Sequence, residues 1–467
     1  MKIPVPDEIL PADRLGRVHL IGIGGAGLSG IARLMHASGV AVSGSDAHDS
    51  AVVRALRTEG VDVHVGHDAT HLDGVDTVIA TTAAREDNPE IVEALTRGLR
   101  LWPRSAGLQS VLLDKHVVAV AGTHGKTTTT AMLTVALREA GLDPTFAIGA
   151  EVAGLGTNAR LGSGDIAVVE ADESDGAFLV YTPRLRVITN VDADHLDHWG
   201  SPEAYEAAFA DFRRGEGITI AGERRHGDLV AGFDDDADVR GHDLRVTDGG
   251  TTFRVTAQGR DLGTVELAVP GRHYATDALL ALAAGLELGG EPAALIRGLG
   301  RHRGAKRRME LVGTVPSVGE ADGAIGAIRV YDSYAHHPSE IRGDLEAARS
   351  LVGSGGRLLV CFQPHLVSRT RLLGAAMGRE LGAADELVVM DVYLAREDAD
   401  PEVSGALVAD AAPLPAEQVR FVPDRAAVVP TLAELARPGD LVLTLGAGDV
   451  TALAPEIVTA LRERRGG

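Results

Sequence analysis

The chain has 467 residues, which is too long for one ordinary hydrophobic core and predicts roughly three domains of about 150 residues each. Its formal net charge of −21 argues against nucleic acid as a partner, because no basic excess is present to displace the counterions of a polyanion. The single cysteine, Cys361, excludes a disulfide within this sequence and a four-thiolate zinc site, and we expect it to be buried in a strand over residues 357–362.

The sequence contains no pattern for export or membrane insertion. Residues 1–17 lack the basic start and the apolar stretch of a signal peptide. No run of the sequence reaches the roughly 18 apolar residues that a membrane-spanning helix needs. We therefore expect a soluble, cytoplasmic protein.

Residues 1–105 predict a Rossmann-like N-terminal α/β domain. An apolar run over residues 17–25 ends in glycine, and residues 27–39 have the spacing of an amphipathic helix. Further strands are predicted over residues 40–46, 61–66 and 75–83. Alternating strands and helices of this kind are typical of a nucleotide-binding domain, and Pro103 favours a boundary shortly after it.

The first glycine-rich turn is a candidate phosphate site. Gly22, Gly24, Gly25 and Gly27 lie between a predicted strand and a predicted helix, where they let the backbone approach a pyrophosphate at the helix N-terminus. Asp46 follows about 20 residues later, where a dinucleotide enzyme would contact ribose. Glycine-rich turns also occur only to pack a helix on a strand, so both interpretations stand at this point.

Residues 106–312 predict a central α/β domain, and a second phosphate-binding turn opens it. In “GTHGKT” the backbone N–H groups would cradle phosphate, Lys126 would neutralise its terminal oxygens, and Thr127 could bind Mg²⁺. The motif has two residues between its glycines where the full P-loop pattern has four. We expect Lys126 to lie on an open, ligand-facing loop, and residues 251–269 to form a β-hairpin.

Acidic and imidazole side chains follow the next two predicted strands of this domain. They are Glu170, Asp172, Glu173 and Asp175, and then Asn190, Asp192, Asp194, His195 and His198. Strand ends of an open α/β sheet face the crevice where ligands bind, and carboxylate oxygens suit Mg²⁺. Each of these residues alone is more often a solvated loop residue, but the nearby P-loop favours Glu170 and His195 as ligands.

Residues 313–467 predict a third, doubly wound domain with four apolar strands, and residues 313–330 are interpreted as a surface connection. The run Lys306, Arg307 and Arg308 alone would be a solvated face. Polar residues at the predicted strand ends are Asp332, Tyr334, His336, His337, His365, Arg369 and Arg371. The histidines lack the thiolate or third clustered imidazole of a transition-metal site, whereas the arginines could hold carboxylate or phosphate.

Ordered motifs run nearly the full length of the chain. They are “HLIGIGGAGLSGIA”, “AGTHGKTTTT”, “VVEADESDGAFL”, “TNVDADHLDHWG”, “PGRH”, “AKRRME”, “YAHHP”, “FQPH”, “SRTR”, “YLARE” and “GAGD”. Together they resemble the Mur ligases of peptidoglycan synthesis. The resemblance implies a Rossmann-like N-terminal domain for a UDP-sugar, a central P-loop ATPase-type domain, and a C-terminal Rossmann-like domain that closes over the active site.

The resemblance also implies an activity, that of an ATP-dependent carboxylate-amine ligase. Such an enzyme would join L-alanine to the lactyl carboxylate of UDP-N-acetylmuramate through an acyl phosphate, giving ADP and phosphate. Its cofactors would be ATP and Mg²⁺, and it would serve peptidoglycan precursor synthesis and thus cell wall biogenesis, cell shape and cell division. Its partners would be these small molecules and not nucleic acid, and the chain would be a monomer or a weak homodimer.

By the same resemblance the functional residues fall into four groups. Those implied to bind the UDP-sugar, the muramoyl carboxylate or L-alanine are Gly24, Gly25, Ala26, Gly27, Asp46, Thr81, Arg104, Tyr334, His336, His365, Arg369 and Arg371. Those implied to bind ATP are Gly122, Thr123, His124, Gly125, Lys126, Thr127, Thr128, His273 and Asp332. The implied Mg²⁺ ligands are Thr127, Glu170 and His195. The implied catalytic residues are Lys126, Glu170, His195, Arg307, Arg308 and His336.

The chain departs from the usual pattern of the family at several positions. Tyr274 and Asp277 stand where asparagines near adenine are common, and Ser333 and Ala335 stand where aspartate and glycine are common. Residues 201–212 contain no lysine, so they offer no candidate for the carbamylated lysine of the ligases that add later amino acids. This absence favours the ligase of the first amino acid.

Three other functions stay open. The nearest is a recycling ligase of the same superfamily that joins a whole tripeptide to UDP-N-acetylmuramate, and the size of the amino-acid pocket decides between the two. An NAD-dependent oxidoreductase would explain the first turn and Asp46, but it leaves Lys126, Glu170 and His195 unexplained. A noncatalytic nucleotide-binding regulator would not need the carboxylates and imidazoles near the second turn.

Overall fold

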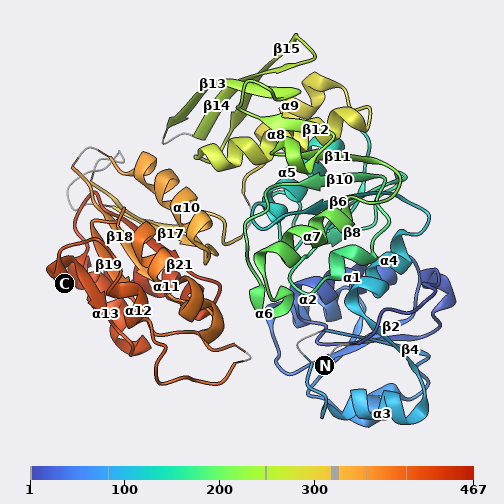
Figure 1. Cartoon of the computed structure of the whole chain (residues 1–467). Coiled ribbons are helices and arrows are strands. Elements are labelled where there is room, and N and C mark those ends of the chain that lie inside the picture. The colour runs from blue at the N-terminus through green and yellow to red at the C-terminus, as the bar shows by residue number, and fades with distance from the viewer. Residues whose placement is uncertain are drawn as a thin grey trace. The chain divides into compact units, whose positions relative to one another are not determined.

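The computed structural model describes residues 3–81, 84–247, 250–304, 306–316, 326–353, 355–395 and 397–466. Within these residues the strands form three sheets accompanied by helices (Figure 1). This α/β architecture confirms the predicted fold class, while the domain boundaries at residues 105 and 312 stay predictions. Residues of the predicted segments and motifs that lie outside the described ranges are 82–83, 305, 317–325 and 396.

The chain divides into two compact units. The first contains Met1–His242, Arg254–Val265 and Thr276–His302, and the second contains Asp243–Phe253, Glu266–Ala275 and Arg303–Gly467. Among the helices of the described residues, none has both the length and the apolar character needed to cross a bilayer.

The first sheet contains parallel strands in the order β3-β2-β1-β4-β5. Its strands are β1 (Val18–Ile21), β2 (Val42–Asp46), β3 (Asp62–Val65), β4 (Thr77–Ala80) and β5 (Arg100–Pro103). The accompanying helices are α1 (Ala26–Ala37), α2 (Ala51–Thr58), α3 (Pro89–Arg97) and α4 (Arg104–Leu112). The strand order reverses beside β1, and open sheets of this type bind ligands at the carboxyl ends of the strands at such a point.

The second sheet has the strand order β15-β14-β13-β12-β11-β10-β6-β9-β7-β8. Its strands are β6 (His116–Ala121), β7 (Thr145–Ala147), β8 (Ala159–Arg160), β9 (Ile166–Glu170), β10 (Leu185–Ile188), β11 (Ile218–Ala221), β12 (Leu229–Gly232), β13 (Val239–Thr247), β14 (Gly250–Ala257) and β15 (Arg260–Leu267). Its helices are α5 (Lys126–Glu139), α6 (Leu196–Trp199), α7 (Pro202–Phe212), α8 (Arg272–Glu287) and α9 (Pro292–Arg301). The neighbouring strands β14 and β15 confirm the predicted hairpin, and the apolar run of β6 lies between two parallel neighbours, as buried parallel strands do.

The third sheet has the order β16-β17-β21-β18-β19-β20, in which β16 is antiparallel to β17. Its strands are β16 (Glu310–Val315), β17 (Ile328–Ser333), β18 (Leu358–Phe362), β19 (Glu386–Val389), β20 (Val419–Phe421) and β21 (Leu441–Leu445). Its helices are α10 (Pro338–Leu351), α11 (Val367–Leu381), α12 (Ala406–Ala409), α13 (Arg425–Leu435) and α14 (Leu453–Gly466). Cys361 is buried in β18, as predicted. The expectation of a surface connection over residues 313–330 is wrong at both ends, because β16 and β17 pair there.

The start of α3 is fixed by its sequence and places a carboxylate in the interior. The Asn88 side chain accepts hydrogen bonds from the backbone N–H groups of Glu90 and Ile91, and Pro89 occupies the first helical position. Gly98 ends the helix with a φ of 65°, a left-handed conformation that favours glycine. The cap therefore holds the side chain of Glu90 in the first turn, where it is completely buried.

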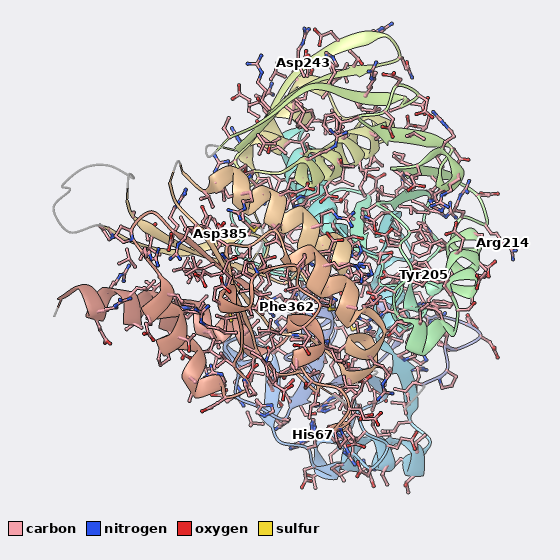
Figure 2. The ribbon with its side chains drawn as sticks, turned by 60° about the vertical axis from the view of Figure 1, so that its left-hand side comes forward. His67, Tyr205, Arg214, Asp243, Phe362 and Asp385 are labelled. Atoms are coloured by element: carbon pink, nitrogen blue, oxygen red, sulfur yellow. The ribbon has the colours of Figure 1, made fainter. Side chains whose placement is uncertain are left out.

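Polar groups from several elements surround the carboxylate of Glu90. The Ser45 hydroxyl of β2 donates to it at 2.6 Å, and Nδ1 of His71 and Nδ1 of His67 lie 2.7 and 3.1 Å from its oxygens (His67 is labelled in Figure 2). His19 of β1 is also buried, with Nε2 at 3.5 Å. Burial opposes the ionised form, but His19, Ser45 and His71 outweigh it and lower the pKa of Glu90 to about 2.

We predict that Glu90→Gln destabilises the fold in a pH-dependent way. The folded-state pKa of about 2 lies below the ordinary value of 4.5, so ionised Glu90 stabilises the fold above pH 4.5 and this contribution is lost as the pH falls towards 2. The free energy of unfolding at pH 7 should fall by roughly 2–4 kcal/mol. Urea unfolding of both proteins from pH 7 to pH 3 measures this. A difference that stays constant over the whole range would contradict the role of the charge.

Candidate active site

The first glycine turn connects β1 to α1 and exposes backbone N–H groups. Gly22 has a φ of 83°, and Gly25 caps α1 without any side-chain hydrogen bond. Residues 25–27 are exposed. The Gly24 N–H donates to Oδ2 of Asp46, the last residue of β2, at 2.9 Å, so this carboxylate holds the turn in place. An uncapped helix start of this kind is suited to an anion, and the predicted contact of Asp46 with ribose stays a prediction.

Two side chains from outside the first turn lie against it. Asn158, which precedes β8, donates from Nδ2 to the Ala26 carbonyl at 2.8 Å, and its Oδ1 accepts from Nη1 of Arg33 at 2.7 Å. Arg104 lies at the start of α4, and its Nη1 is 3.4 Å from where a Cβ on Gly27 would stand. Asn158 was not predicted from the sequence, because a single asparagine in a loop carries no pattern.

The guanidinium of Arg104 lies beside Gly27 of the first turn and forms ion pairs with the acidic loop after β9. Its Nη2 donates to Oδ2 of Asp172 at 2.6 Å and to Oδ2 of Asp175 at 3.1 Å. Burial would lower the pKa of Arg104, but the two carboxylates hold it above its ordinary value. Burial likewise disfavours the charge of Asp172, yet Arg104 and Lys126 hold its pKa well below the usual range. A cation that lies beside the first turn thus acts on the same acidic loop as Lys126 of the second turn.

The second glycine turn follows β6 and needs its two glycines. Gly122 has a φ of 131° and Gly125 a φ of 79°, and Cβ atoms there would lie 2.0 Å from Oγ1 of Thr189 and 2.5 Å from Oδ1 of Asp277. Hydrogen bonds from the loop after β10 hold the turn. The His124 N–H donates to Oδ1 of Asn190 at 2.9 Å. The Thr123 hydroxyl lies 2.8 Å from the hydroxyl of Tyr205 in α7 (Tyr205 is labelled in Figure 2).

Lys126 does not lie on an open loop, so this expectation is wrong. It is the first residue of α5, and its side chain is 14% exposed. Its ammonium group donates to the carbonyls of Gly122 and Thr123 at 2.7 and 3.1 Å and to Oε1 of Glu173 at 3.1 Å. Burial would lower the pKa of Lys126, but Glu173 and neighbouring carboxylates raise it. The reason is topological, because β9 pairs with β6 and ends beside the turn.

Thr127 and Glu170 form a pair of hard oxygen donors. The Thr127 hydroxyl lies 3.0 and 3.1 Å from the two Glu170 oxygens, and the Gly149 N–H donates to Oε2 of Glu170 at 2.7 Å. Within the described residues there is no group of three histidines, cysteines or carboxylates arranged around a metal position. A hydroxyl and one carboxylate nevertheless fit Mg²⁺, which keeps several waters and takes few protein ligands.

His195 lies near the carboxylates of Glu173 and Asp194. Its Nε2 lies 3.7 Å from Oε1 of Glu173 and 3.6 Å from Oδ2 of Asp194. Its backbone has a φ of 51° at the start of α6, a conformation that non-glycine residues adopt rarely and that is found at functional sites. Burial raises the pKa of Glu173 to about 7, although Lys126 opposes that shift. The role of His195 as a metal ligand stays a prediction.

In the second unit, aromatic and basic side chains gather after β17 and β18. The guanidinium carbons of Arg307 and Arg308 lie 4.7 and 5.2 Å from the ring centre of Tyr334, within the range of cation–π contacts. The ring centres of Tyr334 and His336 are 5.1 Å apart, and those of His336 and His365 are 6.2 Å apart. The structure therefore brings together five of the implied site residues, Arg307, Arg308, Tyr334, His336 and His365.

Three other predicted residues of this unit are Arg369, Asp332 and Arg371, of which the first two are buried and the third is largely exposed. The buried Arg369 lies with Nη1 3.5 Å from Nδ1 of His365. Asp332 is also buried and accepts a hydrogen bond from Thr444 at 2.6 Å. Arg371 is largely exposed and forms an ion pair with Asp400, so the contacts of its side chain give it no part in the cluster.

Ser333, which departs from the family pattern, supports a buried carboxylate. Its hydroxyl donates to Oδ2 of Asp344, and Oδ1 of Asp344 is 3.6 Å from Nε2 of His273. Burial raises the pKa of Asp344 to about 7 and lowers the pKa of His273 to about 4. Tyr274 is buried, with its ring centre 4.1 Å from that of His273, so it serves as packing where an asparagine is common.

Comparisons with known proteins agree along the chain. Three family models match successive parts of the chain. The model for “Mur ligase family, catalytic domain” matches residues 17–116, that for “Mur ligase middle domain” matches residues 120–285, and that for “Mur ligase, glutamate ligase domain” matches residues 307–448. A UDP-N-acetylmuramate--L-alanine ligase of Nocardioides sp. is 58% identical over 464 residues, covering 99% of this chain and 100% of that protein.

Two solved structures of ligases with UDP-N-acetylmuramate in their names also match this chain. The UDP-N-acetylmuramate-alanine ligase of Thermotoga maritima matches with a TM-score of 0.80 at 28% identity, over 96% of this chain and 99% of that one. A UDP-N-acetylmuramate:L-alanyl-gamma-D-glutamyl-meso-diaminopimelate ligase from Neisseria meningitides matches with a TM-score of 0.57 at 30% identity, over 63% of this chain and 100% of that one.

We predict that Gly125→Ala weakens nucleotide binding as well as stability. A left-handed φ costs a non-glycine residue about 1–2 kcal/mol, and here the new methyl would also meet the Asp277 carboxylate at 2.5 Å. Gly141 is a matched control because its φ is also 79° and no atom lies within 4 Å of its Cβ position. Gly141→Ala should therefore lose only stability. Urea unfolding and ADP titration compare the two variants, and equal ADP affinities would contradict the assignment of the turn.

Proposed function

Because this chain belongs to the Mur ligase family, we propose that it joins L-alanine to UDP-N-acetylmuramate while ATP is converted to ADP and phosphate. The relative at 58% identity, which spans nearly the same length, supports this substrate pair. The observation that carries the proposal is the bridge from Arg104, which lies beside the first turn, to Asp172 and Asp175 in the loop after β9. Lys126 of the second turn also lowers the pKa of Asp172, so cations beside both turns act on the same acidic loop. An enzyme that binds both a UDP-sugar and ATP needs two such turns, one for the phosphates of each nucleotide.

The chemistry explains why both turns are needed. A carboxylate is a poor electrophile, so the lactyl carboxylate must first be converted to an acyl phosphate. We assign the uncapped turn before α1 to the diphosphate of the UDP-sugar, with Asn158 and Asp46 holding its backbone in place. The turn before α5 then binds the phosphates of ATP, and the Lys126 ammonium neutralises the charge that develops as the terminal phosphoryl group is transferred.

Thr127 and Glu170 would hold Mg²⁺, which when bound shields the negative charge of the phosphates. Glu170 is kept in place by the Gly149 N–H, so its oxygens stay aimed at the Thr127 hydroxyl. His195 is proposed as a ligand of a second Mg²⁺ from the loop after β10. These proposed roles rest on the type of donor atom in each side chain and on the short distance between the Thr127 hydroxyl and the Glu170 carboxylate.

The second unit is proposed to supply the residues for the incoming amino acid. Arg307 and Arg308 would stabilise the transferring phosphoryl group, and the Tyr334, His336 and His365 side chains would orient L-alanine and the carboxylate. The guanidinium of Arg371, which the resemblance also implied for this role, is paired with Asp400. A cytoplasmic location follows from the proposal, since its nucleotide substrates are made there.

The alternative function joins a tripeptide in place of L-alanine. The Neisseria structure with a tripeptide in its name matches 63% of this chain, whereas the Nocardioides L-alanine ligase matches 99% of it at higher identity. The higher identity to the L-alanine ligase, 58% against 30%, therefore favours L-alanine. The two functions differ only in the amine that attacks the acyl phosphate, so one assay separates them.

We predict phosphate release from ATP that requires Mg²⁺, UDP-N-acetylmuramate and L-alanine together. The ratio kcat/KM with L-alanine should exceed that with the tripeptide by at least about 100-fold, because a pocket shaped for a methyl side chain excludes a larger chain sterically. A coupled phosphate assay measures both, and glycine and L-serine serve as near-size controls. Equal turnover with the tripeptide would contradict the first-amino-acid assignment, and reduction of NAD by a hydroxy substrate would contradict the ligase.

A further inference from the structure

Glu173 is a completely buried carboxylate to which the proposed chemistry gives no role. It lies in the loop after β9, and its Oε2 and Oε1 are 2.8 and 3.1 Å from Nζ of Lys126. Glu170, at the end of β9, is paired instead with Thr127. Each glutamate therefore contacts a different residue at the start of α5: Glu170 contacts the Thr127 hydroxyl, and Glu173 contacts the Lys126 ammonium group.

The loop that carries Glu173 is fixed from a second side. Nε1 of Trp199 in α6 donates to the Glu173 carbonyl at 3.0 Å, and Nε2 of His195 lies 3.7 Å from Oε1. The carboxylate is thus held between the first residue of α5 and the loop after β10. Its position does not depend on Lys126 alone, so it can act as a fixed anchor for that side chain.

The ammonium group of Lys126 has three protons, and three acceptor groups are placed around it. They are the carbonyls of Gly122 and Thr123 and the carboxylate of Glu173. A phosphate oxygen can gain a hydrogen bond from Lys126 only by displacing one of them. Glu173 carries the negative charge among the three, so a nucleotide phosphate competes mainly with Glu173 for the lysine.

We propose that Glu173 is a positioning residue that retains Lys126 at the turn until the terminal phosphates of a nucleotide compete for it. The inference rests on the proposed nucleotide site. The ion pair has two opposite effects, because it weakens nucleotide binding by the energy of the contact that must be exchanged, and it aligns Lys126 for phosphoryl transfer. Glu173→Gln keeps the shape of the side chain and removes the charge, which leaves the buried lysine without its nearest counter-charge until phosphate arrives.

The test measures ADP binding and turnover in the full-length protein. Calorimetric titration with ADP, without UDP-sugar or amino acid, should show about tenfold tighter binding by Glu173→Gln than by wild type, while kcat at saturating substrates falls by about tenfold or more. A purely structural role would weaken binding and turnover together. Unchanged or weaker ADP binding by a folded Glu173→Gln protein would overturn the proposal.

Two further variants complete the design. Glu90→Gln removes another completely buried glutamate, in α3, and should leave ADP affinity at the wild-type value. If Glu173→Gln does not fold, Glu173→Asp keeps the charge on a shorter side chain and should bind ADP about two- to threefold more tightly than wild type, and equal or weaker binding would again overturn the proposal. Failure of the wild-type protein to bind ADP would instead contradict the nucleotide site on which the inference rests.

Discussion

The parallel pairing of β6 with β9 and β10 is the constraint on which the candidate site depends. In this register Glu170 lies opposite Val120, and Ile188 lies opposite Ala121. The three strands therefore end at one edge of the sheet, where the second glycine turn, the acidic loop and the loop before α6 meet. Lys126, Thr127 and the glutamates are close to each other because these strands are neighbours.

Charge at this edge is concentrated in a chain that is strongly acidic overall. Two cations, Lys126 and Arg104, face the carboxylates of the loop after β9. Ion pairs removed from water gain little net stability, because desolvation offsets their attraction. What such pairs do provide is position, since each side chain is restrained by partners of opposite charge. The arrangement is therefore better explained by the needs of phosphate chemistry than by the stability of the fold.

Much of the fold and of the site could be predicted from the sequence. Glycine at turns, apolar strand runs and acidic strand ends are local patterns. The sequence could therefore predict the three α/β sheets, the two turns and the proximity of Thr127 and Glu170. The burial of Lys126 was not, because it depends on which strand pairs with β6. The partners of Arg104 and of Asn158 lie about 70 and more than 100 residues away, and no local pattern signals such contacts.

The central claim is that the lactyl carboxylate attacks ATP to form an acyl phosphate. It is tested most directly with UDP-N-acetylmuramate that carries ¹⁸O in that carboxylate, turned over with ATP and L-alanine. The attacking oxygen becomes the bridge to phosphorus, and the carbon–oxygen bond breaks when the amine adds and expels phosphate. We predict that each released phosphate contains one ¹⁸O atom by mass spectrometry. Phosphate released without the label, while the amide product forms, would contradict the account.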